Sequence, residues 1–149
     1  LNPVPMTLQP LAVLAVGGLL GGASGAGALV LYLALGVLGL PVFAGGSAGI
    51  VHLLGPTGGY LLAFPVAAGL TGAIIQRAER IAPLRVLLAC ALGMVVIHAG
   101  GVAQLAALGG DPALAFRLGF VPFLTGDLLK VGLAAAVILA VGHRLRSLL

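Results

Sequence analysis

The chain has 149 residues, of which 61% are hydrophobic and 7% are charged, whereas about 25% are charged in an average soluble domain. No Asp, Glu, Lys or Arg precedes Arg77. This composition excludes a soluble globular domain and a disordered chain, and the basic residues are too scattered for a nucleic-acid surface. We therefore expect an all-α integral membrane protein that forms one domain in the lipid bilayer over residues 1–149.

Five apolar stretches have the composition of membrane helices, which need roughly 20 apolar residues, or fewer where a helix ends in a buried loop. In chain order they cover about 8–22, 26–40, 60–75, 84–108 and 121–142. The first two are short for independent spans, so we expect them to pack within a bundle. Residues 41–59 are glycine-rich and predict a loop. The segment 109–120, which carries Asp111 and Arg117, predicts a short surface helix.

The basic residues predict the orientation of these spans. Those between the third and fourth spans, and those after the fifth, lie on one side: Arg77, Arg80, Arg85, Arg144 and Arg146. The opposite side carries only Arg117. The positive-inside rule therefore places the C-terminus in the cytoplasm. Leu1 then lies outside, and the opening NPVPMTLQP that follows it is typical of a loop. We therefore expect a further helix before Leu1 and a bundle of about six helices.

Small residues recur one turn apart near the start of the chain. Gly17, Gly21 and Gly25 stand at four-residue spacing, as do Gly18 and Gly22. Such spacing lets two helix backbones approach closely in lipid. It fits either the face of a homo-oligomer or close packing inside one bundle. We favour packing inside one bundle, because glycines are spread throughout the chain.

Apart from Arg85 at the very start of the fourth span, Asp127 and Lys130 are the only acidic and basic residues inside a predicted span, and their i, i+3 spacing puts them on one helix face. Each charge costs about 2.5–3.5 kcal/mol at a bilayer centre, so an intramembrane pair indicates a functional site, with a structural ion pair as the alternative. The pair lies near the external end of its span, close to the loop 41–59, which carries Ser47. Convergent polar groups in an apolar lining predict a pocket for a small ligand with N–H donors and a carbonyl acceptor.

The remaining chemistry-bearing residues predict no catalytic or metal site. His52 and His98 stand apart, without the spacing of metal ligands, and we interpret both as packing residues, although His52 lies in the loop near the pocket. Cys90 is the single cysteine, so no intrachain disulfide or CxxC motif exists. The phosphate-binding pattern GxxxxGK[ST] is absent, so this chain cannot itself hydrolyse ATP.

Four motifs resemble those of the BioY family, the biotin-binding membrane subunits of energy-coupling-factor (ECF) transporters. In chain order they are PVPMTLQPLAV, LYLALGVLGLPVFAGGSAG, GPTGGYLLAFPVAAGLTG and PFLTGDLLK. The match runs from Asn2 to about Lys130, and GPTGGY and GDxxK are its most specific parts. The family's first helix, whose small residues usually face the coupling subunit, is missing here.

The resemblance implies a six-helix bundle, without cofactor or enzymatic activity, in the plasma membrane of a prokaryote. Such a subunit captures biotin from outside and docks onto a transmembrane coupling subunit and two cytoplasmic ATPases. Asp127 and Lys130 match the family's binding pair. Ser47 matches a polar position, often Asn, that contacts the ureido ring, and Gln9 and Tyr60 match positions lining the cavity. Two alternatives stay open: a subunit of this architecture for another vitamin, and an intramembrane enzyme using His98 with Asp127.

Overall fold

The computed structural model describes residues 4–77 and 81–146, and the described chain is helical apart from its connections. The elements, in order, are α1 (Gln9–Leu20), α2 (Gly22–Val37), the 3₁₀ turn η1 (Ala44–Gly46), α3 (Val51–Leu54), α4 (Gly58–Gln76), α5 (Pro83–Gly109), α6 (Pro112–Gly119), η2 (Val121–Phe123) and α7 (Leu124–Arg146). The expected all-α architecture is confirmed, and each of the five predicted spans overlaps a helix.

Gly21 alone separates the first two helices. It has a φ of +88°, a backbone conformation that glycine adopts without steric cost, and α2 begins at the next residue. The backbone N–H of Gly22 donates to the Oε1 atom of Gln76, at 3.0 Å, which satisfies one of the free donors at the start of α2. The predicted second span, 26–40, was therefore shifted along the chain: α2 starts and ends earlier than predicted.

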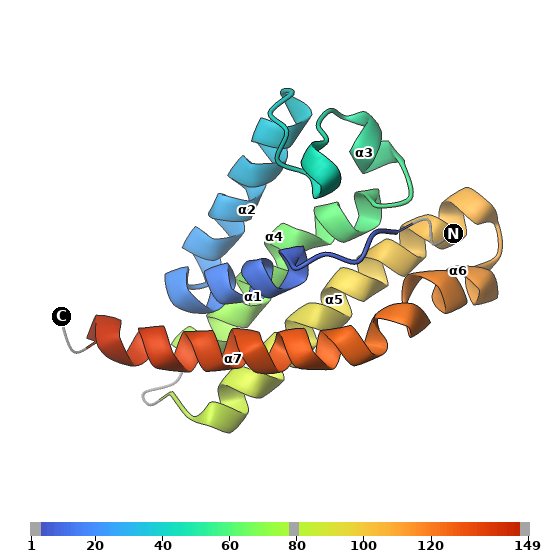
Figure 1. The fold of residues 1–149 in the computed structure, drawn as a ribbon. Coiled ribbons are helices and arrows are strands. Elements are labelled where there is room, and N and C mark those ends of the chain that lie inside the picture. Colours follow the sequence, from blue (N-terminus) through green and yellow to red (C-terminus); the bar gives the residue numbers. More distant parts are fainter. Residues whose placement is uncertain (1–3, 78–80, 147–149) are drawn as a thin grey trace.

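Helix α4 lies at the centre of the bundle and packs against α1, α2 and α5 (Figure 1). Helix α5 packs in turn against α6 and α7, while α7 also lies along α1. Glycines allow the closest of these contacts. A Cβ atom at Gly17 would overlap the backbone of Ala68, and one at Gly59 would overlap the carbonyl of Gly100. The four-residue glycine spacing at the start of the chain is thus used for packing inside the chain, as we favoured.

Three helical stretches are long and apolar enough to cross a membrane: Gly58–Gln76, Pro83–Gly109 and Pro112–Gly142. The apolar helices α1 and α2 are shorter, as expected for elements that pack within the bundle. Large apolar side chains on the outer faces of the helices are exposed, including Leu128 and Leu129 of α7. This pattern suits a chain whose surrounding solvent is lipid.

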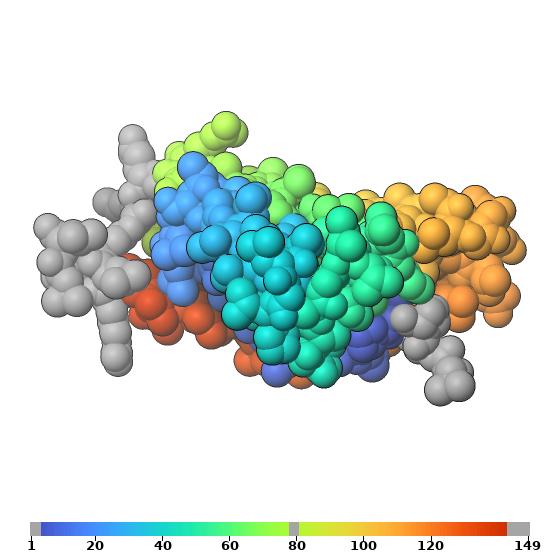
Figure 2. Space-filling view, turned by 90° about the horizontal axis from the view of Figure 1, so that it is seen from above, coloured from blue at the N-terminus to red at the C-terminus, as the bar shows by residue number. Residues whose placement is uncertain are grey.

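The segment between α2 and α4 is more ordered than the predicted loop. It contains η1 and the one-turn helix α3, and it covers the bundle from above in the view of Figure 2, where it is coloured cyan to green. The side-chain amide of Gln104, on α5, donates hydrogen bonds to the carbonyl oxygens of Leu53, at 2.9 Å, and Gly55, at 2.6 Å. These two bonds tie the segment to α5. Side-chain hydrogen bonds from a neighbouring helix therefore hold a backbone that the sequence marks only as glycine-rich.

The predicted surface helix within 109–120 is confirmed as α6. Asp111 precedes it, and its side chain accepts hydrogen bonds from the backbone N–H groups of Ala113, at 2.9 Å, and Leu114, at 3.1 Å. Pro112 follows at the first helical position, where its missing N–H costs nothing. The helix ends at Gly119, and the chain turns through η2 into α7.

Candidate binding site

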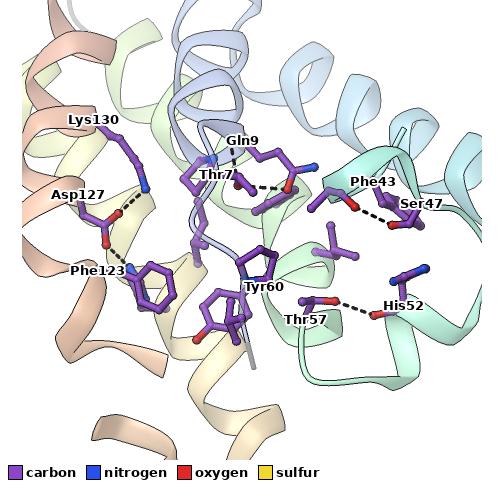
Figure 3. A pocket seen from close by; sticks show the side chains of 18 residues that line it. Thr7, Gln9, Phe43, Ser47, His52, Thr57, Tyr60, Phe123, Asp127 and Lys130 are labelled. Atoms are coloured by element: carbon purple, nitrogen blue, oxygen red, sulfur yellow. Dashed lines mark hydrogen bonds and ion pairs between the residues drawn. The ribbon is translucent and has the colours of Figure 1, made fainter. Parts of the chain in front are cut away.

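A cavity of about 260 Å³ lies between the N-terminal segment, the 41–57 segment and helices α1, α4, α5 and α7 (Figure 3). Its walls are formed by residues from all of these elements: Val4, Pro5, Thr7, Gln9, Pro10, Phe43, Ala44, Ser47, His52, Thr57, Tyr60, Leu61, Phe64, Ile97, His98, Phe123, Asp127 and Lys130. Most of the lining is apolar or aromatic, with a few polar groups, which is the composition of a small-molecule pocket.

All five residues predicted from the sequence line this cavity. Asp127 and Lys130 project from α7 on one side, and Ser47 lies on the opposite side, with Gln9 and Tyr60 between them (Figure 3). The acid and the base therefore face the GGSAG bend across one cavity, an arrangement in which both sides can contact a single ligand.

The acidic and basic side chains of α7 form an ion pair inside the bundle. Lys130 Nζ donates to Asp127 Oδ1 at 3.1 Å, and their side chains are 12% and 9% exposed, respectively. Leu128 and Leu129, between them in sequence, are 72% and 65% exposed, so α7 turns its polar face inward. Asp127 lies in the first turn of α7, where the helix dipole stabilises a carboxylate.

A third residue, His98 of α5, joins this pair. Its Nε2 atom lies 2.5 Å from Asp127 Oδ2, and its Nδ1 atom lies 3.2 Å from the carbonyl oxygen of Gly119. We interpreted His98 as a packing residue; it is buried and hydrogen-bonded, but it also binds the carboxylate of the candidate site. The enzyme alternative alone pairs it with Asp127, and no local signal in the sequence supports that contact, because the two are 29 positions apart and on different helices.

The end of α6 positions both His98 and Tyr60. The last carbonyls of a helix have no partner within it, and the carbonyl of Gly119 accepts from the Tyr60 hydroxyl, at 2.6 Å, as well as facing His98. The Tyr60 proton is therefore committed to Gly119. What Tyr60 presents to the cavity is its ring and the lone pairs of its oxygen.

Gln9 is anchored to α2 from the first turn of α1. Its Nε2 atom donates to the Tyr32 hydroxyl at 2.7 Å, and that hydroxyl donates to the carbonyl of Val42 at 3.0 Å. Thr7 adds a longer contact, from its hydroxyl to Gln9 Oε1 at 3.4 Å. This chain of hydrogen bonds joins the N-terminal segment, α1, α2 and the 41–57 segment along one rim of the cavity.

Ser47 is turned in part toward its own backbone. Its hydroxyl donates to the carbonyl of Ala44 at 2.8 Å, closing the bend that contains η1. Its oxygen retains lone pairs that can accept a hydrogen bond. Thr57, on the same side of the cavity, likewise donates to a backbone carbonyl, that of His52 at 3.2 Å (Figure 3).

Aromatic side chains form much of the apolar lining, although no motif in the sequence predicted which of them would line it. Phe43, Phe64 and Phe123 are each 5% exposed or less and come from three separate elements. No buried side-chain nitrogen or oxygen lacks a hydrogen-bond partner in the part of the chain that the structure describes. Over the same residues, no group of three or more His, Cys, Asp or Glu side chains gathers as a metal site would require.

The fold and the cavity together define a helical membrane protein with an internal cavity whose lining suits a small, mainly apolar ligand with polar ends. The family profile described as "BioY family" matches residues 1–147. The chain therefore belongs to the BioY family.

Similar proteins extend along nearly the whole chain. The "Probable biotin transporter BioY" of Pyrococcus horikoshii is 41% identical over 94% of this chain and 80% of its own length. The "Biotin transporter BioY" of Thermotoga maritima is 40% identical over 93% of this chain and 81% of its own length. Among solved structures, the S-component for biotin from an ECF-type ABC transporter superposes with a TM-score of 0.85 at 29% identity, covering 99% of this chain and 78% of that one.

The family excludes one of the two alternatives that the sequence left open. It is a family of multi-pass membrane transporters, so the chain is a transport protein and not an enzyme. The hypothesis of an intramembrane enzyme is therefore wrong, even though His98 and Asp127 are in contact. Their contact is therefore not that of a catalytic pair.

Proposed function

We propose that this chain is the biotin-binding S subunit of an ECF transporter and that it captures biotin from the external side of the membrane. The observation that carries this proposal is the buried Asp127–Lys130 pair at one end of an apolar cavity, in a member of a family of biotin transporters. A buried ion pair is weak support for stability, because desolvation of two charges offsets their attraction. A role in ligand recognition explains why it is there.

The cavity matches the chemistry of biotin, an apolar bicycle with a urea group and a carboxylate-bearing tail. Asp127 can accept a urea N–H, while Lys130 can donate to the urea carbonyl or to the carboxylate. On the opposite wall, the free lone pairs of Ser47 suit a second polar group of the ligand. Gln9 and Tyr60 contribute to the rim and the apolar wall.

The sequence contains no nucleotide-binding pattern, which fits a transporter whose ATP hydrolysis takes place on separate subunits. We propose that the chain docks onto a transmembrane coupling subunit and two cytoplasmic ATPases. The positive-inside rule supports an orientation with the C-terminus and the turn at Arg77 in the cytoplasm. In that orientation α6 and the 41–57 segment lie on the external side.

Titration of the purified chain with biotin tests the binding site. We expect Asp127→Asn and Lys130→Met to weaken binding by about tenfold or more each, since a hydrogen bond to a charged group contributes about 1.5–3 kcal/mol. Leu129→Ala is the matched control: it lies on the same turn of α7 but is 65% exposed, and binding should stay within about twofold of wild type. Unfolding curves of each variant separate loss of the site from loss of the fold.

Two results would contradict the proposal. Wild-type affinity after both substitutions would remove Asp127 and Lys130 from the site. Displacement of a bound ligand by thiamine or riboflavin, but not by biotin, would assign the cavity to another vitamin. Co-purification of the chain with ATPase subunits, and loss of biotin uptake when those subunits are inactivated, would test the proposed coupling.

A further inference from the structure

The hydrogen bonds of His98 determine how many protons its ring carries. The Gly119 carbonyl can only accept, so the Nδ1 atom that faces it at 3.2 Å is a donor. Nε2 lies 2.5 Å from Asp127 Oδ2, and two bare lone pairs would repel at that distance, so a proton lies between these two atoms. The pair formed by His98 and Asp127 thus holds one proton more than a neutral imidazole and a carboxylate would.

This extra proton changes the charge of the site. An imidazolium beside a carboxylate, or a neutral imidazole beside a carboxylic acid, gives a pair with no net charge. Lys130, which donates to the other carboxylate oxygen at 3.1 Å, then adds one positive charge that nothing compensates. Without His98, Asp127 and Lys130 would cancel.

The surroundings of His98 leave that charge unbalanced. Its ring packs edge-on against Tyr60 and Phe120, with centroids at 5.9 and 5.1 Å, and lies 5.9 Å from Phe123. Among the described side chains of the helices packed against α5, the other charged groups near this end are Asp111 and Arg117 of α6, and both are exposed. Arg85 of α5 and position 143 of α7 lie more than about three helical turns away along their helices.

We propose that His98 is a specificity-determining residue, which gives the cavity one net positive charge and so selects ligands that carry a carboxylate. The proposal rests on the proposed function, because the anion that it selects is the ionised acid of biotin. It does not depend on which end of the ligand meets Lys130: in a water-poor cavity, an attraction between unit charges persists along the length of a small ligand. His98 acts here through the charge of its pair with Asp127 and through the position of that carboxylate.

The test compares biotin with biotinamide, in which a neutral amide replaces the carboxylate, by calorimetry on the full chain at neutral pH. Wild-type protein should bind biotin at least about tenfold more tightly than biotinamide, the size expected for two unit charges separated by a ligand's length at an effective dielectric constant near 20. In His98→Gln the amide can still donate to Asp127, but no extra proton is held. We expect the ratio of the dissociation constant of biotinamide to that of biotin to fall by about tenfold.

The matched control is His52→Gln, the same substitution at the other histidine on the cavity wall, which is not paired with a carboxylate in the structure. Any change in affinity should be the same for biotin and biotinamide, so the ratio of the two dissociation constants should stay at the wild-type value. If His98→Gln does not fold, titration of wild-type protein with biotin in buffers of different ionisation enthalpy gives an independent answer. A site that already holds its extra proton should take up no proton from the buffer when the anion binds, so the uptake of one proton would show that the free site lacked it.

The outcomes separate the two proposals. If wild-type protein binds neither ligand, the proposed function fails. Four other results would overturn the role of His98 while biotin binding stands. Biotin and biotinamide could bind equally well, or His98→Gln could keep the wild-type ratio. His52→Gln could lower the ratio to the same extent as His98→Gln, or biotin binding could take up one proton.

Discussion

Asp127 shows how a carboxylate can be kept inside a membrane bundle. Its two oxygens have separate partners, Lys130 on Oδ1 and His98 on Oδ2, and it lies at the start of a helix. An isolated charge at the bilayer centre costs about 2.5–3.5 kcal/mol, and partners on both oxygens offset much of that cost. The same arrangement holds the carboxylate in one orientation, so little ordering is left for the ligand to impose.

Tyr60 allows a prediction for one atom of this network. Tyr60→Phe removes the hydroxyl that donates to Gly119 but keeps the ring, and the Gly119 carbonyl retains His98. We expect the free energy of unfolding to fall by about 1 kcal/mol, the usual contribution of one hydrogen bond, with biotin affinity reduced less than about tenfold. Equilibrium unfolding in detergent and biotin titration measure the two effects. Tyr60→Leu, which also removes the ring, should bind biotin more weakly than Tyr60→Phe; equal losses would mean that the hydroxyl, and not the ring, serves the ligand.

Helix α4 links packing to the site because its glycines set how closely it approaches α5. Gly59 meets the carbonyl of Gly100, and the ring of Tyr60, the next residue, fills the space beside Gly101. Both α4 and α5 contribute side chains to the cavity just beyond this contact. A change in the distance between the two helices therefore displaces Tyr60 and His98 relative to α7.

Two glycine substitutions test this contact. Gly59→Ala adds a methyl group where the backbone of Gly100 lies, so we expect a loss of about 1–3 kcal/mol in the free energy of unfolding and weaker biotin binding. Gly27→Ala is the control, since no atom lies within 4 Å of the added carbon on α2. It should be neutral or stabilising by up to about 1 kcal/mol, because alanine has the higher helix propensity. If the two variants are equally stable, α4 and α5 are not limited by this contact.

At the scale of the whole molecule, the distribution of charge is the basis of the proposed orientation. Arg77 follows α4 at one end of the bundle, whereas α6 with Arg117 follows α5 at the other. The single cysteine, Cys90, is 0% exposed, so a thiol reagent should label introduced, exposed cysteines and leave Cys90 unmodified.

Cysteine labelling in intact cells tests the orientation. A membrane-impermeant maleimide should modify Ala113→Cys, an exposed position on α6, without permeabilisation. Arg77→Cys, also exposed, should react only after the membrane is opened. Wild-type protein, in which only the buried Cys90 is present, is the control. The reverse pattern would place the C-terminus outside and the cavity on the wrong side for uptake.

The amino-acid sequence by itself determined the class of protein and most of its elements. The near absence of charge required a membrane helix bundle, because charged side chains are costly in lipid and apolar ones are costly in water. The i, i+3 spacing of Asp127 and Lys130 predicted their contact, since one helical turn separates them. The segment 109–120, with Asp111 and Arg117, likewise predicted the short helix that is α6. These features are local, so they can be read along the chain.

Only the tertiary structure decided which residues meet across the cavity. His98 joins Asp127 over 29 positions and Tyr60 reaches Gly119 over 59, and these contacts depend on how closely α4, α5 and α7 pack. The sequence also did not show that Ser47 lies opposite the ion pair, because the path of the glycine-rich 41–57 segment is held by side chains of other elements. Helix formation follows from nearby residues, whereas the charge of a site depends on groups that folding brings together from distant parts of the chain.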